Sequence, residues 1–344
     1  NLLRDCPGFT TITIPDTVTE IGDSAFEDCK QLSSVILSSN LAKLGKGAFS
    51  NCTSLTSIRI PKSLETVDAG TWGEEHAPFI GCAALSDIEF ETGMTKIPAN
   101  LLRDCPGFTT ITIPDTVTDI GNYAFSDCKQ LSSVSLSNNL AKLGDGAFSD
   151  CTSLTSIRIP KRLEVSNWPF DGCSALQNVE FEQGITRIPD NLFYKCSGLT
   201  TVTIPDTVTE IGASAFSSSS LSSIVIPDTV TDIGDCVFSG CTELKEVTLP
   251  NIRKNIVAGM FKNCTSLEKI VLPETVTAIR SDAFEGCTAL TDVTIPDSVK
   301  SIGYGVFSDC SALSAVTLPD GVKELGGQLF NNCDALTTVT IPDS

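Results

Sequence analysis

Cysteine is the residue type whose number and spacing in this sequence could most readily support chemistry. The chain has 15 cysteines and 1 histidine. Most cysteines recur every 23 residues in three runs, which are Cys6, Cys29, Cys52; Cys82, Cys105, Cys128, Cys151; and Cys241, Cys264, Cys287, Cys310, Cys333. Such a ladder could form disulfides, bind metal or pack as reduced thiols. It lacks the close cysteine pairs of zinc sites, so no metal and no cofactor are expected.

The spacing favours the interpretation that the cysteines pack in the core as reduced thiols. Equivalent side chains in a column point the same way, and a disulfide would tie each repeat to only one neighbour. A buried thiol behaves as a small hydrophobe, and Ser219 fills one place in the ladder. Cys236 stands outside the ladder and is predicted to face outward, so it is the candidate reactive thiol.

Two further groups of residues are candidates for binding. An insertion at 68–77 holds Trp72, Glu74, Glu75 and His76, and insertions in repeats form loops that often bind partners. The alternative is a tolerated loop without a binding role, whose tryptophan folds back on the protein.

Charged pairs form the second group. Arg59 precedes Glu89, and Arg158 precedes Glu180, each by one repeat. Across adjacent strands such pairs stabilise a sheet by roughly 0.2–1 kcal/mol. They are either plain ion pairs of a duplicated block or part of a polar recognition patch.

Composition argues against several classes of function. With 42 acidic and 23 basic residues the net charge is −19, which disfavours nucleic acid and anionic membranes as partners. No apolar run is long enough to insert in a membrane. A single histidine, with no phosphate loop or nucleophile motif, predicts that the chain is not an enzyme.

A fixed repeat in the 20–30-residue range predicts a solenoid of stacked turns. Each turn begins with a β-branched, Thr-rich strand such as 11–14, which Pro15 and Asp16 end because proline cannot donate to a ladder. A short extended piece follows, and 25–29 is predicted to form a single helical or 3₁₀ turn. About 15 parallel turns of 23 residues are expected.

Apolar residues recur at fixed places in each turn and are predicted to form the interior. A neighbouring turn must cover them, so no turn should fold alone. The core ladder is represented by Phe26, Phe49, Phe125, Phe148, Cys29, Cys52, Cys128, Cys151, Cys264 and Cys287. We expect one domain, 1–344, that is cut within a repeat at both ends and continues in the parent protein beyond at least one of them.

The phrase Ile14-Pro15-Asp16-Thr17-Val18, followed by Ile21-Gly22, Ala25-Phe26, Cys29 and Leu32, resembles the BspA-type, or treponemal-class, leucine-rich repeat over essentially the whole chain. That resemblance implies a curved, right-handed leucine-rich repeat rod with a parallel sheet on its concave face. It also implies a secreted or surface-attached bacterial protein without shared catalytic residues.

Two functions follow from the resemblance. The first is adhesion through protein–protein contacts, with a host or microbial surface or matrix protein as partner. The alternative is a stalk that presents another domain of a larger surface protein. The oligomeric state and the identity of the ligand stay open.

Overall fold

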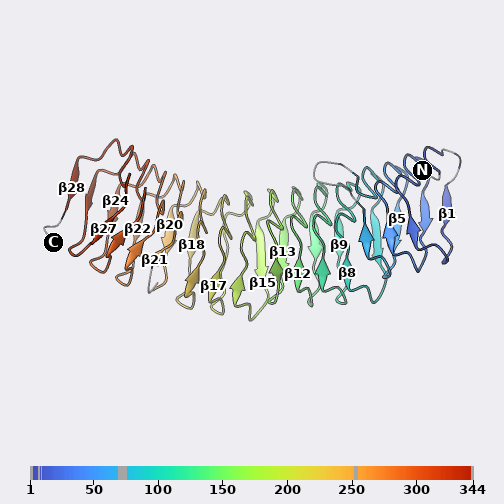
Figure 1. Cartoon of the computed structure of the whole chain (residues 1–344), viewed down its shortest axis with the longest axis horizontal. Coiled ribbons are helices and arrows are strands. Elements are labelled where there is room, and N and C mark those ends of the chain that lie inside the picture. The colour runs from blue at the N-terminus through green and yellow to red at the C-terminus, as the bar shows by residue number, and fades with distance from the viewer. Residues whose placement is uncertain (1–2, 7, 9, 69–75, 252–254, 342–344) are drawn as a thin grey trace. The chain divides into compact units, whose positions relative to one another are not determined.

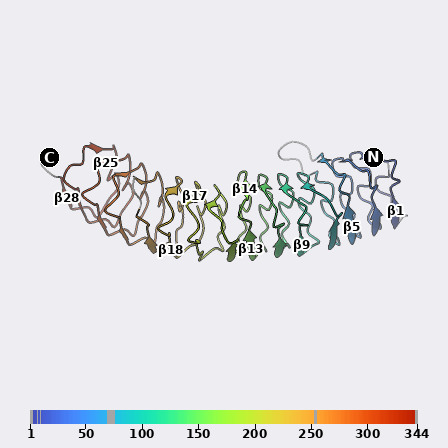
Figure 2. The ribbon, with the colours of Figure 1, turned by 90° about the horizontal axis from the view of Figure 1, so that it is seen from below.

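The computed structural model describes residues 3–6, 8, 10–68, 76–251 and 255–341. The chain divides into two compact units, Asn1–Glu180 and Phe181–Ser344, and each unit is a stack of turns. Every turn contributes up to two strands, a longer one of three or four residues and a shorter one of two residues. Figures 1 and 2 show that the two kinds of strand lie on different sides of the turns within each unit.

The first unit holds the strands β1 to β15. Its longer strands are β1 (Thr11–Thr13), β3 (Ser34–Ile36), β5 (Ser57–Ile60), β7 (Asp87–Phe90), β9 (Thr110–Thr112), β11 (Ser133–Ser135), β13 (Ser156–Ile159) and, at the boundary, β15 (Asn178–Phe181). Its shorter strands are β2 (Glu20–Ile21), β4 (Lys43–Leu44), β6 (Thr66–Val67), β8 (Lys96–Ile97), β10 (Asp119–Ile120), β12 (Lys142–Leu143) and β14 (Glu164–Val165).

The second unit holds the strands β16 to β28. Its longer strands are β18 (Ser223–Val225), β20 (Glu246–Thr248), β22 (Lys269–Val271), β24 (Asp292–Thr294), β26 (Ala315–Thr317) and β28 (Thr338–Thr340). Its shorter strands are β16 (Arg187–Ile188), β17 (Glu210–Ile211), β19 (Asp232–Ile233), β21 (Asn255–Ile256), β23 (Ala278–Ile279), β25 (Ser301–Ile302) and β27 (Glu324–Leu325).

Strands of equivalent position pair in parallel, one turn with the next. Ile12 lies opposite Val35, and Val35 lies opposite Ile58, so the register follows the sequence repeat. Along most longer strands more buried residues alternate with exposed ones, as a sheet with one face on a core requires, whereas all three residues of β28 are exposed. The parallel-strand leucine-rich repeat solenoid predicted from the sequence is thereby confirmed.

The structure has about 14 turns, against the prediction of about 15, since each set of described strands has 14 members. The segment 201–205 has the same alternating sequence as the longer strands but forms no strand.

The expected helical turn at 25–29 is wrong, since the described residues contain no helix. Ser24 and Asp28 both have left-handed backbones, with φ of 51° and 60°, and equivalent positions in other turns do the same. A helix needs right-handed φ at every residue, so these two positions interrupt it. The amide of Phe26 instead donates to the carbonyl oxygen of Ala48 in the next turn, at 2.7 Å.

Stacked phenylalanine rings fill the centre of each unit. Phe26 and Phe49 have ring centroids 5.0 Å apart, and Phe125 and Phe148 have centroids 4.9 Å apart, with nearly parallel rings. All four rings are buried. Each ring therefore needs the adjacent turn to exclude water from its faces, which makes neighbouring turns mutually dependent.

Candidate functional site

The cysteine ladder lies directly beside the phenylalanine stack and is part of the core. The Sγ atom of Cys52 lies 3.2 Å from the carbonyl oxygen of Phe26, and that of Cys128 lies 3.1 Å from the carbonyl oxygen of Leu102. The same thiol-to-carbonyl contact is made by Cys29, Cys82, Cys151, Cys173, Cys241, Cys264, Cys287, Cys310 and Cys333. Each thiol thus donates to the backbone of the preceding turn, a role that sequence reasoning missed.

The ladder thiols are poor nucleophiles because burial disfavours the thiolate. Burial raises the pKa of Cys52 and Cys105 from 9.0 to about 12, and that of Cys241 to about 11. All cysteines of the described residues are free thiols. Within the described ranges, no three His, Cys, Asp or Glu side chains are grouped so as to hold a metal ion.

Cys236 lies outside the ladder and is half-buried, as are Cys6 and Cys333. Burial, followed by the negative charge of Asp235, raises the pKa of the Cys236 thiol above 9.0. Cys236 is therefore accessible but not activated, and its reactivity remains a prediction.

The pair Arg59 and Glu89 lies on the outward face of the longer strands. Their residues are register partners on β5 and β7, and Nε of Arg59 lies 3.5 Å from Oε1 of Glu89. Both side chains are more than half exposed, at 60% and 65%. Beside them Ile36 on β3 is 61% exposed, and Val225 on β18 and Val271 on β22 are likewise exposed on their longer strands.

Ile36 and Arg59 line a surface hollow of about 430 Å³. The hollow is bounded by Asp16, Pro61 and Glu91 from the turns that end the strands. The Ser39 amide donates to Oδ1 of Asp16 at 2.8 Å, and this hydrogen bond lowers the pKa of that carboxyl. An apolar side chain, a guanidinium and two carboxylates thus converge on one concave patch.

A second copy of this arrangement surrounds Arg158, whose Nε lies 3.3 Å from Oε1 of Glu180. Two differences distinguish the copies. Ser135 replaces the exposed isoleucine, and Arg158 also donates to Oδ1 of Asn138 at 3.0 Å. The second guanidinium is therefore more restrained, and no apolar side chain accompanies it on the neighbouring strand.

Most of the insertion at 68–77 falls outside the described residues, including Trp72, Glu74 and Glu75. Its two flanks are described. Asp68 Oδ2 lies 2.9 Å from Nζ of Lys43, and the carbonyl oxygen of His76 accepts a hydrogen bond from the amide of Gly47 at 2.8 Å. His76 also lines a polar hollow of about 600 Å³ with Ser24 and Asn51. A binding role for the insertion stays a prediction.

An aromatic edge lies in the same column of turn positions as Cys236, which the sequence predicts to face outward. Tyr123 and Trp168 occupy equivalent left-handed positions, with φ of 54° and 50°, and Trp168 is 46% exposed. The guanidinium carbon of Arg103 lies 5.6 Å from the Tyr123 ring centroid, within the range of a cation–π contact. Gly146 lies in the turn between those of Tyr123 and Trp168, and its lack of a side chain leaves room for the tyrosine ring.

Parallel turns are stacked on one another, and columns of leucine, phenylalanine and cysteine run through the stack. This arrangement defines a leucine-rich repeat protein. The family model for the BspA type leucine rich repeat region matches six times, over residues 1–76, 74–175, 164–291 and 277–344. The chain belongs to this family. Among the described residues, no helix is long and apolar enough to cross a bilayer.

Solved structures agree with this assignment. A leucine-rich repeat protein from Bacteroides ovatus is 30% identical, covers 96% of this chain and 86% of its own, and superposes with a TM-score of 0.77. A leucine rich cell surface protein from Faecalibacterium prausnitzii is 26% identical, with 93% and 88% covered and a TM-score of 0.52. A comparison with curated proteins found no match.

Proposed function

We propose that the chain is a non-enzymatic, extracellular protein that binds a surface or matrix protein through the face around Arg59. The carrying observation is the exposed Ile36 beside the Arg59–Glu89 pair at the edge of a 430 Å³ hollow. Binding hot spots are enriched in arginine and lie in patches that a partner can desolvate. Leaving an isoleucine in water forgoes roughly 1.5–3 kcal/mol, which a partner that covers it would recover.

The extracellular location is supported by the relative from Faecalibacterium prausnitzii, which is described as a cell surface protein. The absence of enzymatic function is supported by the arrangement of the candidate residues. The ladder thiols have raised pKa values, and the charged side chains of this face are exposed ion pairs rather than a desolvated acid–base pair.

The experiment measures binding of the full chain to a panel of immobilised extracellular-matrix proteins, with Arg59→Ala and Ile36→Ser as variants. Arg158→Ala is the matched control, because it removes the same group from the duplicated site without the isoleucine. We expect the first two variants to weaken binding about tenfold or more and the control to weaken it less than threefold. Equal effects of Arg59→Ala and Arg158→Ala would contradict the role of this patch.

A stalk that presents another domain is the second candidate. Its support is the small, polar character of most outward strand positions, such as Thr110, Thr112, Ser133 and Ser135. If no matrix protein binds the wild-type chain, and all outward variants retain its stability, the stalk function is favoured over adhesion.

A further inference from the structure

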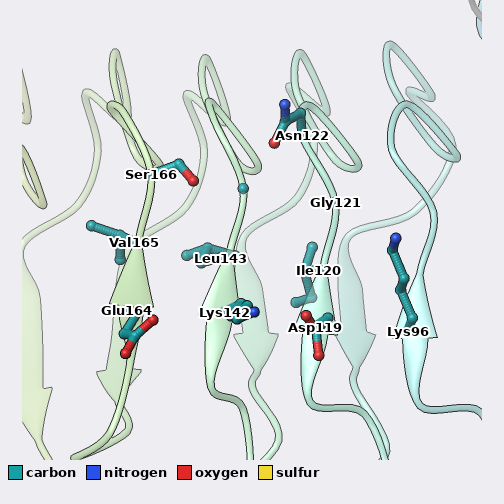
Figure 3. A pocket seen from close by; sticks show the side chains of 11 residues that line it. Lys96, Asp119, Ile120, Gly121, Asn122, Lys142, Leu143, Glu164, Val165 and Ser166 are labelled. Carbon is teal, nitrogen blue, oxygen red and sulfur yellow. The ribbon is translucent and has the colours of Figure 1, made fainter.

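Four charged residues of alternating sign form a row across the shorter strands of the first unit. The charged row consists of Lys96 on β8, Asp119 on β10, Lys142 on β12 and Glu164 on β14. They are register neighbours, because Asp119 pairs with Lys96 on one side and with Lys142 on the other, and Lys142 pairs with Glu164. Figure 3 shows the four side chains standing on adjacent strands.

No ion pair within 4.0 Å joins any member of the charged row to another described residue, although opposite charges are neighbours. Asp119 does accept a hydrogen bond from the Thr118 hydroxyl at 2.7 Å. Lys96, Lys142 and Glu164 are exposed to solvent. The charges of the row therefore remain available to an outside partner.

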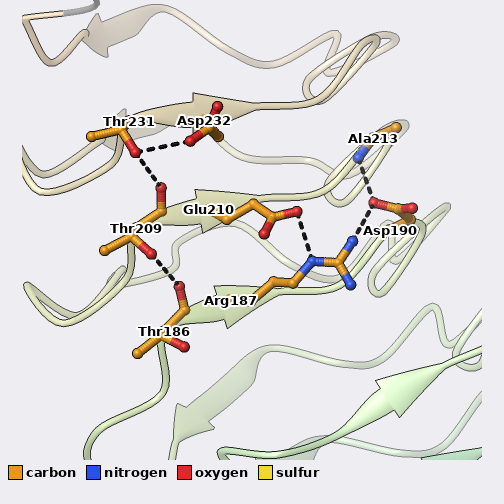
Figure 4. A network of polar contacts seen from close by, with 8 residues as sticks. All are labelled: Thr186, Arg187, Asp190, Thr209, Glu210, Ala213, Thr231 and Asp232. Atoms are coloured by element: carbon orange, nitrogen blue, oxygen red, sulfur yellow. Dashed lines mark hydrogen bonds and ion pairs between the residues drawn. The ribbon is translucent and has the colours of Figure 1, made fainter.

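Two other rows on the shorter strands contain internal ion pairs. Lys43 on β4 pairs with Glu20 at 3.1 Å and with Asp68 at 2.9 Å, and both contacts raise the pKa of the lysine, that with Asp68 the more. In the second unit Arg187 on β16 donates to Glu210 at 2.8 Å and to Asp190 at 3.3 Å, as Figure 4 shows. The charged row of β8 to β14 differs from both.

The surface around the row is hollowed rather than covered. Gly121 and Gly144 lie next to it, and a Cβ at Gly121 would be 2.4 Å from the amide nitrogen of Ala99. A residue with a side chain therefore does not fit at either position. A hollow of about 390 Å³ remains, lined by the row together with Asn122 and Ser166.

We propose that the charged row is an interface between two copies of this chain in antiparallel arrangement. A two-fold axis in the interface, parallel to the strands and midway between β10 and β12, places Lys96 opposite Glu164 of the second copy. The same axis places Asp119 opposite Lys142. All four positions then face opposite charge, which is the self-complementarity that an isologous interface requires.

The alternative two-fold axis, along the direction of stacking, would place each residue opposite its own copy. Lys96 would then face lysine and Asp119 would face aspartate, and like charges in contact repel. The order of charges in the row thus selects the antiparallel arrangement. The row itself carries no net charge. Two copies, each with a net charge of −19, can therefore contact each other there without local repulsion.

Such a dimer is weak and depends on salt. The row spans only four two-residue strands, well below the area of a permanent interface, and exposed ion pairs each contribute about 1 kcal/mol or less. Salt screens exposed charges over about 10 Å at 0.1 M and about 3 Å at 1 M. This interface uses the shorter strands, and it is independent of the function proposed for Arg59 on the longer strands.

The test is sedimentation velocity of the full chain over a concentration series, at low salt and at 1 M salt, with charge-exchange variants. Lys142→Glu alone and Asp119→Lys alone each place like charges at both central contacts. Together the two substitutions restore opposite charges there. Lys269→Glu on β22 is the control, because it makes the same charge change on a longer strand of the second unit.

We expect a concentration-dependent dimer at low salt that dissociates at 1 M salt. Each single exchange should weaken dimerisation tenfold or more, the double exchange should recover most of that loss, and the control should change it less than twofold. Circular dichroism confirms that every variant is folded. A wild-type chain that stays monomeric at low salt, or a double exchange as weak as the single ones, would overturn the interface.

Discussion

The ring of Tyr123 lies over Gly146 in the next turn, so closely that a Cβ added to the glycine would be 2.6 Å from Cε1 of the tyrosine. Gly146 also has a left-handed backbone, with φ of 52°. Two separate physical reasons, ring contact and backbone conformation, therefore favour glycine at this position, although Tyr123 and Trp168 adopt the same left-handed backbone at equivalent positions. They can be separated because Gly47 occupies the equivalent place, with φ of 55°, and has no ring above it.

We predict that Gly146→Ala destabilises the chain more than Gly47→Ala. The left-handed backbone should cost each variant roughly 1–2 kcal/mol, and only Gly146→Ala must also displace a ring. Chemical denaturation of both variants, alone and with Tyr123→Ala, measures the difference. In the Tyr123→Ala background the two alanine variants should cost the same, and a persistent gap between them would show that the ring is not responsible.

Replacing a ladder cysteine tests whether its thiol stabilises the fold as a donor as well as by packing. Cys151 is buried, and its Sγ lies 3.2 Å from the carbonyl oxygen of Phe125. Cys151→Ala loses both donor and volume and should lower the free energy of unfolding by about 1–3 kcal/mol. Cys151→Ser keeps a donor, as Ser219 does in the natural ladder, and should cost less than half as much. Equal losses in thermal or urea unfolding would assign the role to packing alone.

Stability should fall as the pH rises above 9. The folded pKa of Cys52, Cys105 and Cys310 is about 12, against an ordinary value of 9.0. Between these values the unfolded chain releases the thiol protons and the folded chain retains them, so unfolding becomes more favourable by about 1.4 kcal/mol per pH unit for each thiol. Below pH 9 this effect is absent.

Urea titrations at pH 8, 9, 10 and 11 measure this dependence. Cys105→Ser removes one such thiol, and its unfolding free energy should fall less steeply with pH than that of the wild type. Parallel slopes for variant and wild type would assign the alkaline loss to lysines and tyrosines instead.

Thiol modification of the native chain should be confined to the half-buried cysteines. Cys6, Cys236 and Cys333 are partly exposed, and the remaining thiols are buried. With iodoacetamide at pH 7.5 we expect slow labelling of these three sites, located by peptide mass spectrometry, and complete labelling only in denaturant. The raised pKa of Cys236 predicts that its rate increases with pH through 9. Rapid native labelling of Cys128 or Cys264 would show that the ladder is not part of a closed core.

The candidate binding residues could be predicted from the sequence only in part. Register follows from the repeat, so the meeting of Arg59 with Glu89 could be predicted from their spacing. The hollow beside them could not be predicted, because it depends on Pro61 and Glu91, which come from two turns whose backbone course no pattern in the sequence specifies. The charged row could also be predicted only in part. Its alternating order of charges follows from the sequence and the register, but its lack of internal ion pairs does not.

The stacking of turns and the identity of the interior follow from the amino-acid sequence alone, because apolar residues that recur at a fixed interval have only the neighbouring turn to cover them. The path of the chain between strands depends instead on tertiary contacts. Ser24 and Asp28 take left-handed backbones where the local sequence favours a helical turn, and the amides of Ser24, Phe26 and Asp28 bond to the next turn instead of along the chain. Hydrogen bonds to a neighbouring turn outweigh a local preference of less than about 1 kcal/mol per residue, and that competition exists only once the turns are stacked.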